Sequence, residues 1–202
     1  MNLYLLLAVT TSFTLLSFID APYRDELWLQ HAPTLVLLIA AAFTIRWGLL
    51  SNASMLCIFA FLWLHILGAR WIYSFVPYDQ WSESLIGFSV SEFFGWTRNQ
   101  YDRLVHLASG VLLVRPASEI LQRYAGMRPL GGALLSIAVV LAIGAIYEIL
   151  EWQIAITFSP RQAEAYNGQQ GDIWDPQKDM ALAWLGATLA AGLIRRSDLS
   201  AT

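Results

Sequence analysis

Long apolar runs are the feature that most constrains what this sequence can fold into. The clearest extends from Leu130 to Tyr147 without a charged residue, and similar runs recur along the chain. A bilayer core about 30 Å thick needs about 20 mostly apolar residues per spanning helix. Hydrophobic residues make up 57% of the 202 residues and charged residues only 13%, whereas soluble domains are about 25% charged. The sequence therefore predicts an all-α, polytopic membrane helix bundle.

Six runs are long enough, or nearly so, to cross a bilayer, which predicts about six transmembrane helices in one integral-membrane domain over residues 1–202. Their expected bounds are 3–19, 33–50, 54–76, 104–121, 130–152 and 176–194. The dipeptide Arg115-Pro116 predicts a kink or an end in the fourth helix, because proline lacks the N–H that a helix interior uses. The first run has no basic segment before it and no small-residue cleavage site after it, so we expect a retained helix.

Segment 77–99 between the third and fourth runs carries aromatic residues among acids. Aromatic side chains favour the headgroup level of a bilayer. Part of this segment is therefore expected on the membrane surface, with lipids as its partners. The aromatic residues are Trp81, Phe88, Phe93, Phe94 and Trp96.

The distribution of arginine indicates the orientation in the membrane. With six spans the two sides receive equal numbers of basic residues, but segment 122–129 and the pair Arg195-Arg196 concentrate arginine on one side. We expect that side to be cytoplasmic, with both termini on it. The formal net charge of −3 argues against a nucleic-acid partner.

Polar residues from four separate segments should meet at one membrane face, because successive spans alternate in direction. Asp102 and His106 are four residues apart, and Glu148 and Glu151 three apart, so each pair shares a helix face. Small residues continue these faces, and membrane helices pack closely through small residues. The expected set is His65, Arg70, Asp102, Arg103, His106, Glu148, Glu151, Asp172, Asp175 and Asp179.

Six of these residues are carboxylates, and Arg70, Arg103 and Lys178 could neutralise only half of them. A bound cation, shared protons or water must balance the rest. Carboxylates with histidine are suitable ligands for Mg²⁺, Mn²⁺, Zn²⁺ or iron. The predicted metal ligands are Asp102, His106, Glu148, Glu151, Asp172 and Asp179, with supporting roles for His65, Arg70, Arg103 and Asp175.

Each of these polar residues also has a purely structural interpretation. Asp175 precedes Pro176, a pattern typical of a helix N-cap, and Asp102 could cap a helix or interact with its dipole. His65 could simply hydrogen-bond a neighbouring helix, and Arg103 could be an interfacial anchor or a counter-charge. The whole set could be a polar network that only holds the helices in register.

Four blocks of the sequence resemble the YjdF-type inner-membrane proteins: "HILGARWIY" from His65, "YDRLVHLASG" from Tyr101, "YEILEW" from Tyr147 and "GDIWDPQKDM" from Gly171. The chain is more loosely similar to the VanZ-like membrane proteins. It departs from their pattern at Arg103, where lysine is usual, and at Glu151, where glutamine is usual. The resemblance implies a bacterial inner-membrane location and no particular reaction.

Three functions fit these observations. The first is a metal-dependent enzyme acting on a lipid or lipid-linked substrate, with Glu148 and His106 as the catalytic residues and a metal-activated water as the nucleophile. The second is a small proton or cation transporter, since acids inside a membrane often mark ion pathways. The third is a non-catalytic structural or accessory membrane protein.

Overall fold

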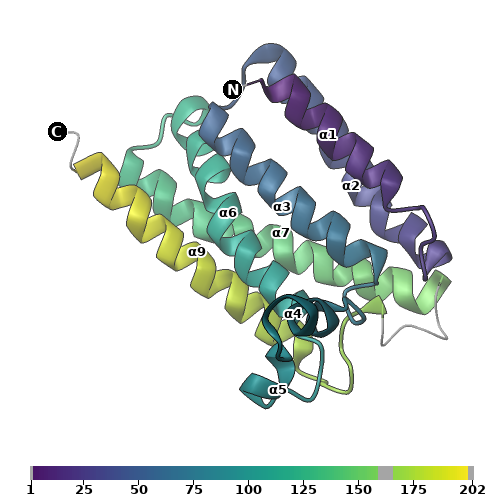
Figure 1. Ribbon diagram of the computed structural model, residues 1–202. Helices are drawn as coiled ribbons and strands as arrows, with labels where there is room; N and C mark the ends of the chain where they lie inside the picture. Colours follow the sequence, from purple (N-terminus) through teal and green to yellow (C-terminus); the bar gives the residue numbers. More distant parts are fainter. Residues whose placement is uncertain (1, 159–165, 200–202) are drawn as a thin grey trace.

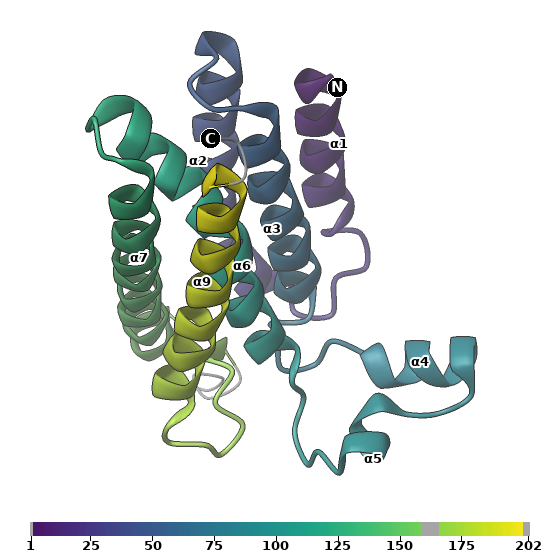
Figure 2. The same ribbon diagram turned by 90° about the vertical axis from the view of Figure 1, so that its left-hand side faces the viewer.

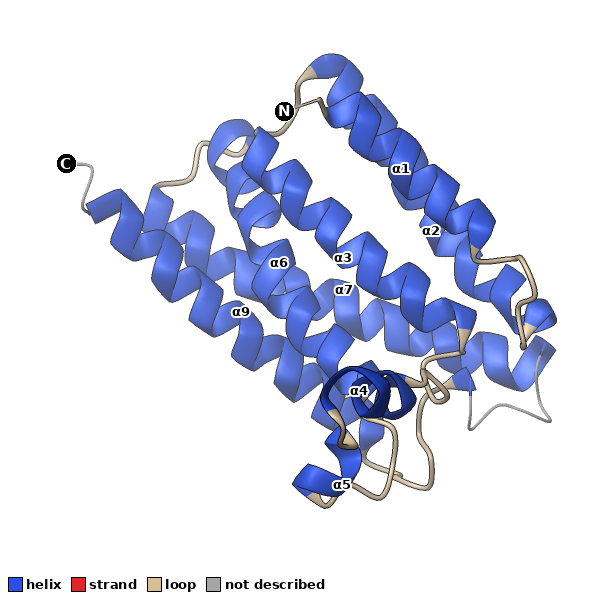
Figure 3. Ribbon diagram, viewed as in Figure 1, coloured by secondary structure: helices blue, strands red, loops and turns tan. Residues whose placement is uncertain are grey.

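A computed structural model describes residues 2–158 and 166–199, and within these ranges every regular element is a helix (Figures 1 and 3). The predicted all-α class is therefore confirmed. The helices are α1 (Leu3–Leu16), α2 (Arg24–Trp47), α3 (Asn52–Arg70), α4 (Tyr78–Ile86), α5 (Val90–Phe94), α6 (Tyr101–Tyr124), α7 (Pro129–Phe158) and α9 (Asp175–Leu199).

Four helices, α2, α3, α6 and α7, are long and apolar enough to cross a membrane. Helix α1 is apolar but has only 14 residues, and α9 has 25 residues. A rise of about 1.5 Å per residue makes α9 roughly as long as α6. The long helices lie side by side, so the described part of the chain forms a helical membrane bundle. The count of six spans remains a prediction.

The bundle has two layers that share α3. Helices α6, α7 and α9 pack against one another, α3 packs on α6, and the hairpin of α1 and α2 packs on α3 (Figures 1 and 2). Two glycines bring α6 and α9 into backbone contact. A Cβ on Gly110 would lie 2.1 Å from the Ala183 carbonyl oxygen, and one on Gly186 would lie 2.4 Å from the Leu107 carbonyl oxygen. This close approach fixes the position of α9 relative to the first turns of α6.

The helices that contain Pro33 and Pro116 both continue through the proline. The expected helix 33–50 begins instead at Arg24, with Pro33 inside it and with Asp25 and Glu26 favourably placed in its first turn. The expected helix 104–121 runs from Tyr101 to Tyr124 through Pro116, with neither an end nor a break at that residue. Membrane bundles tolerate such prolines because neighbouring groups satisfy the freed carbonyl.

Three further helix ends differ from the prediction. The first helix ends at Leu16 rather than residue 19. The third ends at Arg70 rather than residue 76, because the chain turns where Ile72 and Tyr73 adopt left-handed φ values of 43° and 56°. Helix α7 continues past residue 152 to Phe158, and residues 159–165 of the polar loop predicted at 153–175 lie outside the described residues.

The segment between α3 and α6 leaves the bundle and holds α4 and α5, where the sequence analysis expected only a loop. Figure 2 shows α4 projecting sideways from one end of the bundle, away from the long helices. Both short helices end at a glycine in the left-handed conformation, Gly87 and Gly95. The segment starts and finishes at the same end of the bundle, because α3 ends there and α6 begins there.

Candidate functional site

The first turns of α6 and α9 and the last turns of α7 meet at one end of the bundle (Figure 1). Asp102 and His106 lie on α6, Glu148 and Glu151 on α7, and Asp179 on α9. We call these five residues the inner cluster. These residues meet at one end of the bundle, as expected from the alternating direction of successive helices. The contact between Gly110 and Ala183 keeps Asp179 on α9 close to the residues on α6.

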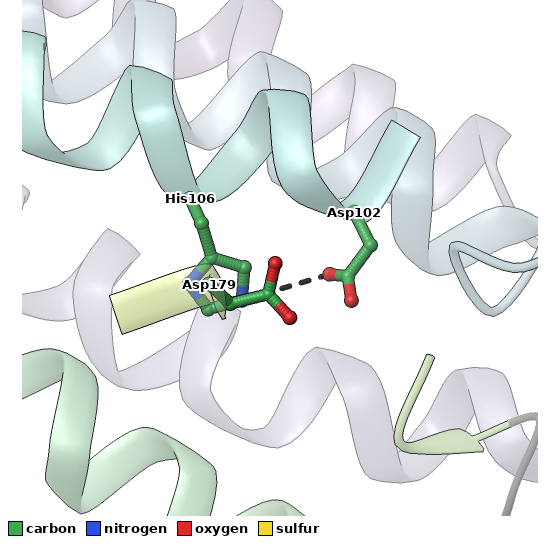
Figure 4. Close-up of side chains that lie close together, drawn as sticks. All are labelled: Asp102, His106 and Asp179. Carbon is green, nitrogen blue, oxygen red and sulfur yellow. Dashed lines mark ion pairs between the residues drawn. The ribbon is translucent and has the colours of Figure 1, made fainter. Parts of the chain in front are cut away.

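Asp102, His106 and Asp179 form the tightest part of the inner cluster. One ligand atom from each lies within 4.8 Å of the other two, and all three side chains are buried (Figure 4). The His106 Nε2 atom lies 3.6 Å from Asp102 Oδ1 and 3.3 Å from Glu148 Oε1. His106 therefore joins carboxylates of α6 and α7 beside the carboxylate of α9.

Glu151 extends the inner cluster toward α2 and α3. Its buried carboxyl group lies within electrostatic range of Asp102 and Glu148. Tyr147 donates a hydrogen bond to the Gln30 side-chain oxygen at 3.3 Å and is also hydrogen-bonded to Tyr73. Tyr147 thereby connects α7 with the polar groups between α2 and α3.

The inner cluster contains four carboxylates, and none of them has a lysine or arginine ion-pair partner among the described residues. Asp179 is only 2% exposed, yet its Oδ1 atom is buried without a hydrogen-bond partner. A buried charged oxygen without a partner is costly. The arrangement is therefore suited to a cation or to shared protons.

A second group of charges lies beside the inner cluster, and we call it the outer cluster: Arg98, Arg103, Asp172, Asp175 and Lys178. Arg98 binds both Asp175 oxygens, at 2.5 and 3.0 Å, although the Asp175 side chain is fully buried. Arg103 donates to Asp172 at 2.7 Å and to Asp175 at 3.2 Å, and Lys178 donates to Asp172 at 2.5 Å. Both acids are therefore neutralised.

The ionisation of the outer cluster follows from these contacts. The hydrogen bond from Lys178 holds the pKa of Asp172 below its ordinary range. Burial disfavours the charged form of Arg98, but the hydrogen bond and attraction of Asp175 outweigh it, so the pKa of Arg98 lies above its ordinary value. The outer cluster consists of charged, mutually satisfied groups.

The loop before α9 separates the two clusters. Gly168 has a φ of 72°, and a Cβ there would lie 2.2 Å from Asp102 Oδ2, so only glycine allows this approach. The Gly168 carbonyl accepts a hydrogen bond from Arg98 at 2.7 Å. Asn99 and Gln170 exchange two further hydrogen bonds, at 2.9 and 3.1 Å. The loop is thereby held over Asp102 by the Arg98 side chain and the Asn99 backbone, both just before α6.

The comparisons with known proteins agree with this description. Residues 2–198 match the family described as "Predicted membrane protein (DUF2238)". The chain belongs to this family. The family description identifies a membrane protein and assigns it no reaction.

Inner membrane protein YjdF of Escherichia coli strain K12 is one relative of this chain. The two sequences are 38% identical over 137 residues, which cover 64% of this chain and 60% of that protein. The match thus spans about three fifths of the relative's length. The predicted resemblance to YjdF-type proteins is confirmed. No solved structure is significantly similar to the chain.

Three residues that were predicted to join the clustered carboxylates lie elsewhere in the structure. Arg70 donates to the carbonyls of Ser17 and Ile19 at the end of α1, at 2.5 and 2.7 Å, and not to the carboxylates. His65 binds Thr34 at 2.9 Å and Tyr73, as the structural interpretation expected. Asp172, predicted as a metal ligand, lies in the outer cluster.

The sequence analysis missed Arg98, the main partner of Asp175. Asp175 was predicted in a supporting role, with N-capping as its structural alternative, and its carboxylate is held by two arginines. A signal was available: arginines at 98 and 103 flank the start of α6, at the same membrane face as the acids. Gly168 carried no comparable signal, because its role depends on the path of the loop.

Proposed function

We propose that the inner cluster binds a divalent metal ion and that the protein is a metal-dependent membrane enzyme acting on a lipid or lipid-linked ester. The observation that carries this proposal is the group formed by Asp102, His106 and Asp179, whose ligand atoms lie within 4.8 Å of one another. The unpartnered Asp179 oxygen supports it independently. A cation placed there would satisfy that oxygen and offset the excess of negative charge.

Two carboxylates and one imidazole form a three-residue ligand set. Zinc, manganese and iron accept mixed nitrogen and oxygen ligands of this kind. Catalytic metal sites typically use three protein ligands and leave a position for water or substrate. The set therefore fits a catalytic site better than a closed structural one.

Glu148 is the proposed general base, because its Oε1 atom lies 3.3 Å from His106 Nε2, at the edge of the ligand set. Glu148 takes a proton from the attacking water while the water oxygen bonds to the carbon or phosphorus of the ester. The bond to the leaving alcohol oxygen then breaks, and Glu148 returns the proton to that alcohol. Bound metal would polarise the ester and lower the pKa of the water.

The position of the inner cluster supports a lipid substrate. It lies where α6 and α9 begin and α7 ends, at the end of the bundle from which the segment with α4 and α5 projects (Figure 2). That segment exposes large apolar side chains, including Leu85 at 83% and Phe93 at 71%. Such a surface fits the headgroup region of a bilayer. Membrane lipids are accordingly the proposed partners.

The proposed location is the bacterial inner membrane, as for the relative YjdF. The arginines of segment 122–129 lie at the bundle end opposite the inner cluster. Under the positive-inside rule both termini are cytoplasmic, and the cluster faces the outer leaflet. Labelling of single cysteines at Ser84 and at Ala125, with a membrane-impermeant reagent on intact cells, tests this: Ser84→Cys alone should react.

Metal analysis of purified protein tests the catalytic site. The parent should hold about one metal per chain after reconstitution with Zn²⁺, Mn²⁺ or Fe²⁺, and His106→Ala and Asp179→Asn should lose it. Asp172→Asn is the matched control, because this acid lies nearby in the outer cluster. Absence of stoichiometric metal from the folded parent with every ion would refute the proposal and favour shared protons, as in a transporter.

A further inference from the structure

A hollow of about 450 Å³ opens beside the outer cluster. It lies between the segment that follows α5 and the loop that precedes α9. Its polar lining is rich in hydrogen-bond donors, and one wall is aromatic. The residues that matter here are Trp96, Thr97, Arg98, Gln100, Arg103 and Gln170.

Within the outer cluster itself, the ion-paired charges do not balance. Three cations, Arg98, Arg103 and Lys178, pair with only two carboxylates, Asp172 and Asp175. The outer cluster therefore carries one excess positive charge. A ligand with a single negative charge would complete it.

Arg103 is the residue with donor capacity left. Its Nη1 atom donates only to Gln100 and its Nη2 atom donates to Asp172 and Asp175, while its Nε atom is buried and has no hydrogen-bond partner. In contrast, Arg98 uses its terminal nitrogens on Asp175 and on the carbonyls of Gly168 and Gln169. An anion in the hollow would therefore bind through Arg103, while Arg98 holds the loop.

The aromatic wall of the hollow continues onto an exposed apolar surface. Trp96 stacks on Phe94, with ring centroids 4.8 Å apart, and Phe94 contacts Phe93. Phe93 and Phe94 are both exposed. The apolar chain of a molecule whose charged group occupies the hollow would therefore contact the exposed aromatic side chains of α5.

We propose that this hollow binds the phosphodiester of a membrane phospholipid. A phosphodiester carries one negative charge, equal to the excess of the outer cluster, and arginine is a preferred partner of phosphate oxygens. The acyl chains extend past Trp96 along α5. This inference deepens the proposed function, on which it rests for the substrate class: the lipid ester acted on belongs to a phospholipid.

The hollow is adjacent to the inner cluster. Arg103 directly follows Asp102 in α6, and Gly168, whose carbonyl binds Arg98, packs against Asp102. A phospholipid held at Arg103 therefore lies across this loop from the candidate metal ligands. The headgroup site positions the substrate, and the inner cluster performs the chemistry.

Binding to metal-free protein tests the inference without any need for activity. The protein, purified in a maltoside detergent with a chelator present, is titrated calorimetrically with dihexanoylphosphatidylglycerol. Parallel titrations use inorganic phosphate and uncharged dihexanoylglycerol. We expect the phospholipid to bind at least tenfold more tightly than either. Arg103→Gln should weaken phospholipid binding at least tenfold, and Arg103→Lys, which keeps the charge but lacks Nε–H, should weaken it less.

Two control variants separate this inference from the proposed function. Arg123→Gln removes an arginine at the opposite end of the bundle, where it pairs with Glu119, and should bind like the parent. His106→Ala should also bind like the parent, because it removes a candidate metal ligand and not the hollow. Unchanged binding by folded Arg103→Gln and Arg103→Lys overturns the headgroup site, and equal affinity for inorganic phosphate overturns its assignment to lipid. Loss of metal binding alone leaves the headgroup site intact.

Discussion

Asp175 and Asp179 differ sharply although they lie four residues apart on α9 and are both buried. Asp175, in the outer cluster, is bound by Arg98 and Arg103. Asp179, in the inner cluster, has an oxygen without a partner and lies near Asp102 and His106. One helix thus supplies both a neutralised structural acid and an unneutralised acid. Pairing, rather than burial, distinguishes a stabilising carboxylate from a candidate ligand.

The largest expected effect comes from breaking the outer cluster at Arg98. Arg98→Gln leaves the buried Asp175 carboxylate without its main partner, and breaking such a buried pair costs about 3–5 kcal/mol. The free energy of unfolding in mixed micelles measures this loss. Arg123→Gln is the control, since its half-exposed pair with Glu119 is worth only about 0.3–0.5 kcal/mol. Equal losses in the two variants would contradict the structural role of the outer cluster.

Separating α6 from α9 should damage the inner cluster without changing any charge. Gly110→Ala places a Cβ against the backbone of Ala183 and Ala187, and such overpacking typically costs about 1–3 kcal/mol. Because Asp179 moves with α9, metal binding should also be lost, as measured by elemental analysis. Gly144→Ala on α7, where a Cβ meets nothing within 4 Å, should keep both stability and metal. Retained metal in folded Gly110→Ala would contradict the assigned geometry.

Neutralising the two acids of α9 should change stability in opposite directions. Asp179→Asn removes charge from an unneutralised group, so the metal-free protein should become more stable, by about 0.5–2 kcal/mol. Asp175→Asn removes the partner of two arginines and should destabilise the protein. Thermal unfolding of both variants in chelator measures the difference. Destabilisation of similar size in both would mean that the inner cluster is a structural network.

The smallest effect concerns Asp172 and pH. The folded pKa of Asp172 lies below its ordinary value, so its ionised form favours the folded state. That stability is complete above the unfolded pKa of about 3.9 and is lost as pH falls through the folded pKa. Asp172→Asn should therefore flatten the fall in melting temperature below about pH 4. If the melting temperature of the variant falls as steeply as that of the parent below this pH, groups other than Asp172 cause the loss of stability in acid.

The sequence was sufficient to predict which helices carry the acids but not where each helix ends. The hydrophobic runs located the bundle, and the spacings of Asp102 to His106 and Glu148 to Glu151 placed each pair on one helix face. The helix start expected at residue 33 and the helix end considered at Pro116 do not occur, because backbone groups inside a packed bundle are satisfied by neighbours that a local pattern does not include.

The sequence by itself determined that the chain is a helical membrane protein with its acids and His106 at one end, because hydrophobic length and alternating direction are properties of the chain alone. The tertiary structure decided which acids are neutralised. Arg98 reaches Asp175 across 77 residues, and Gly168 brings the loop against Asp102. Such pairings depend on how loops fold over helix ends, and that arrangement separates the paired outer cluster from the inner cluster proposed to bind metal.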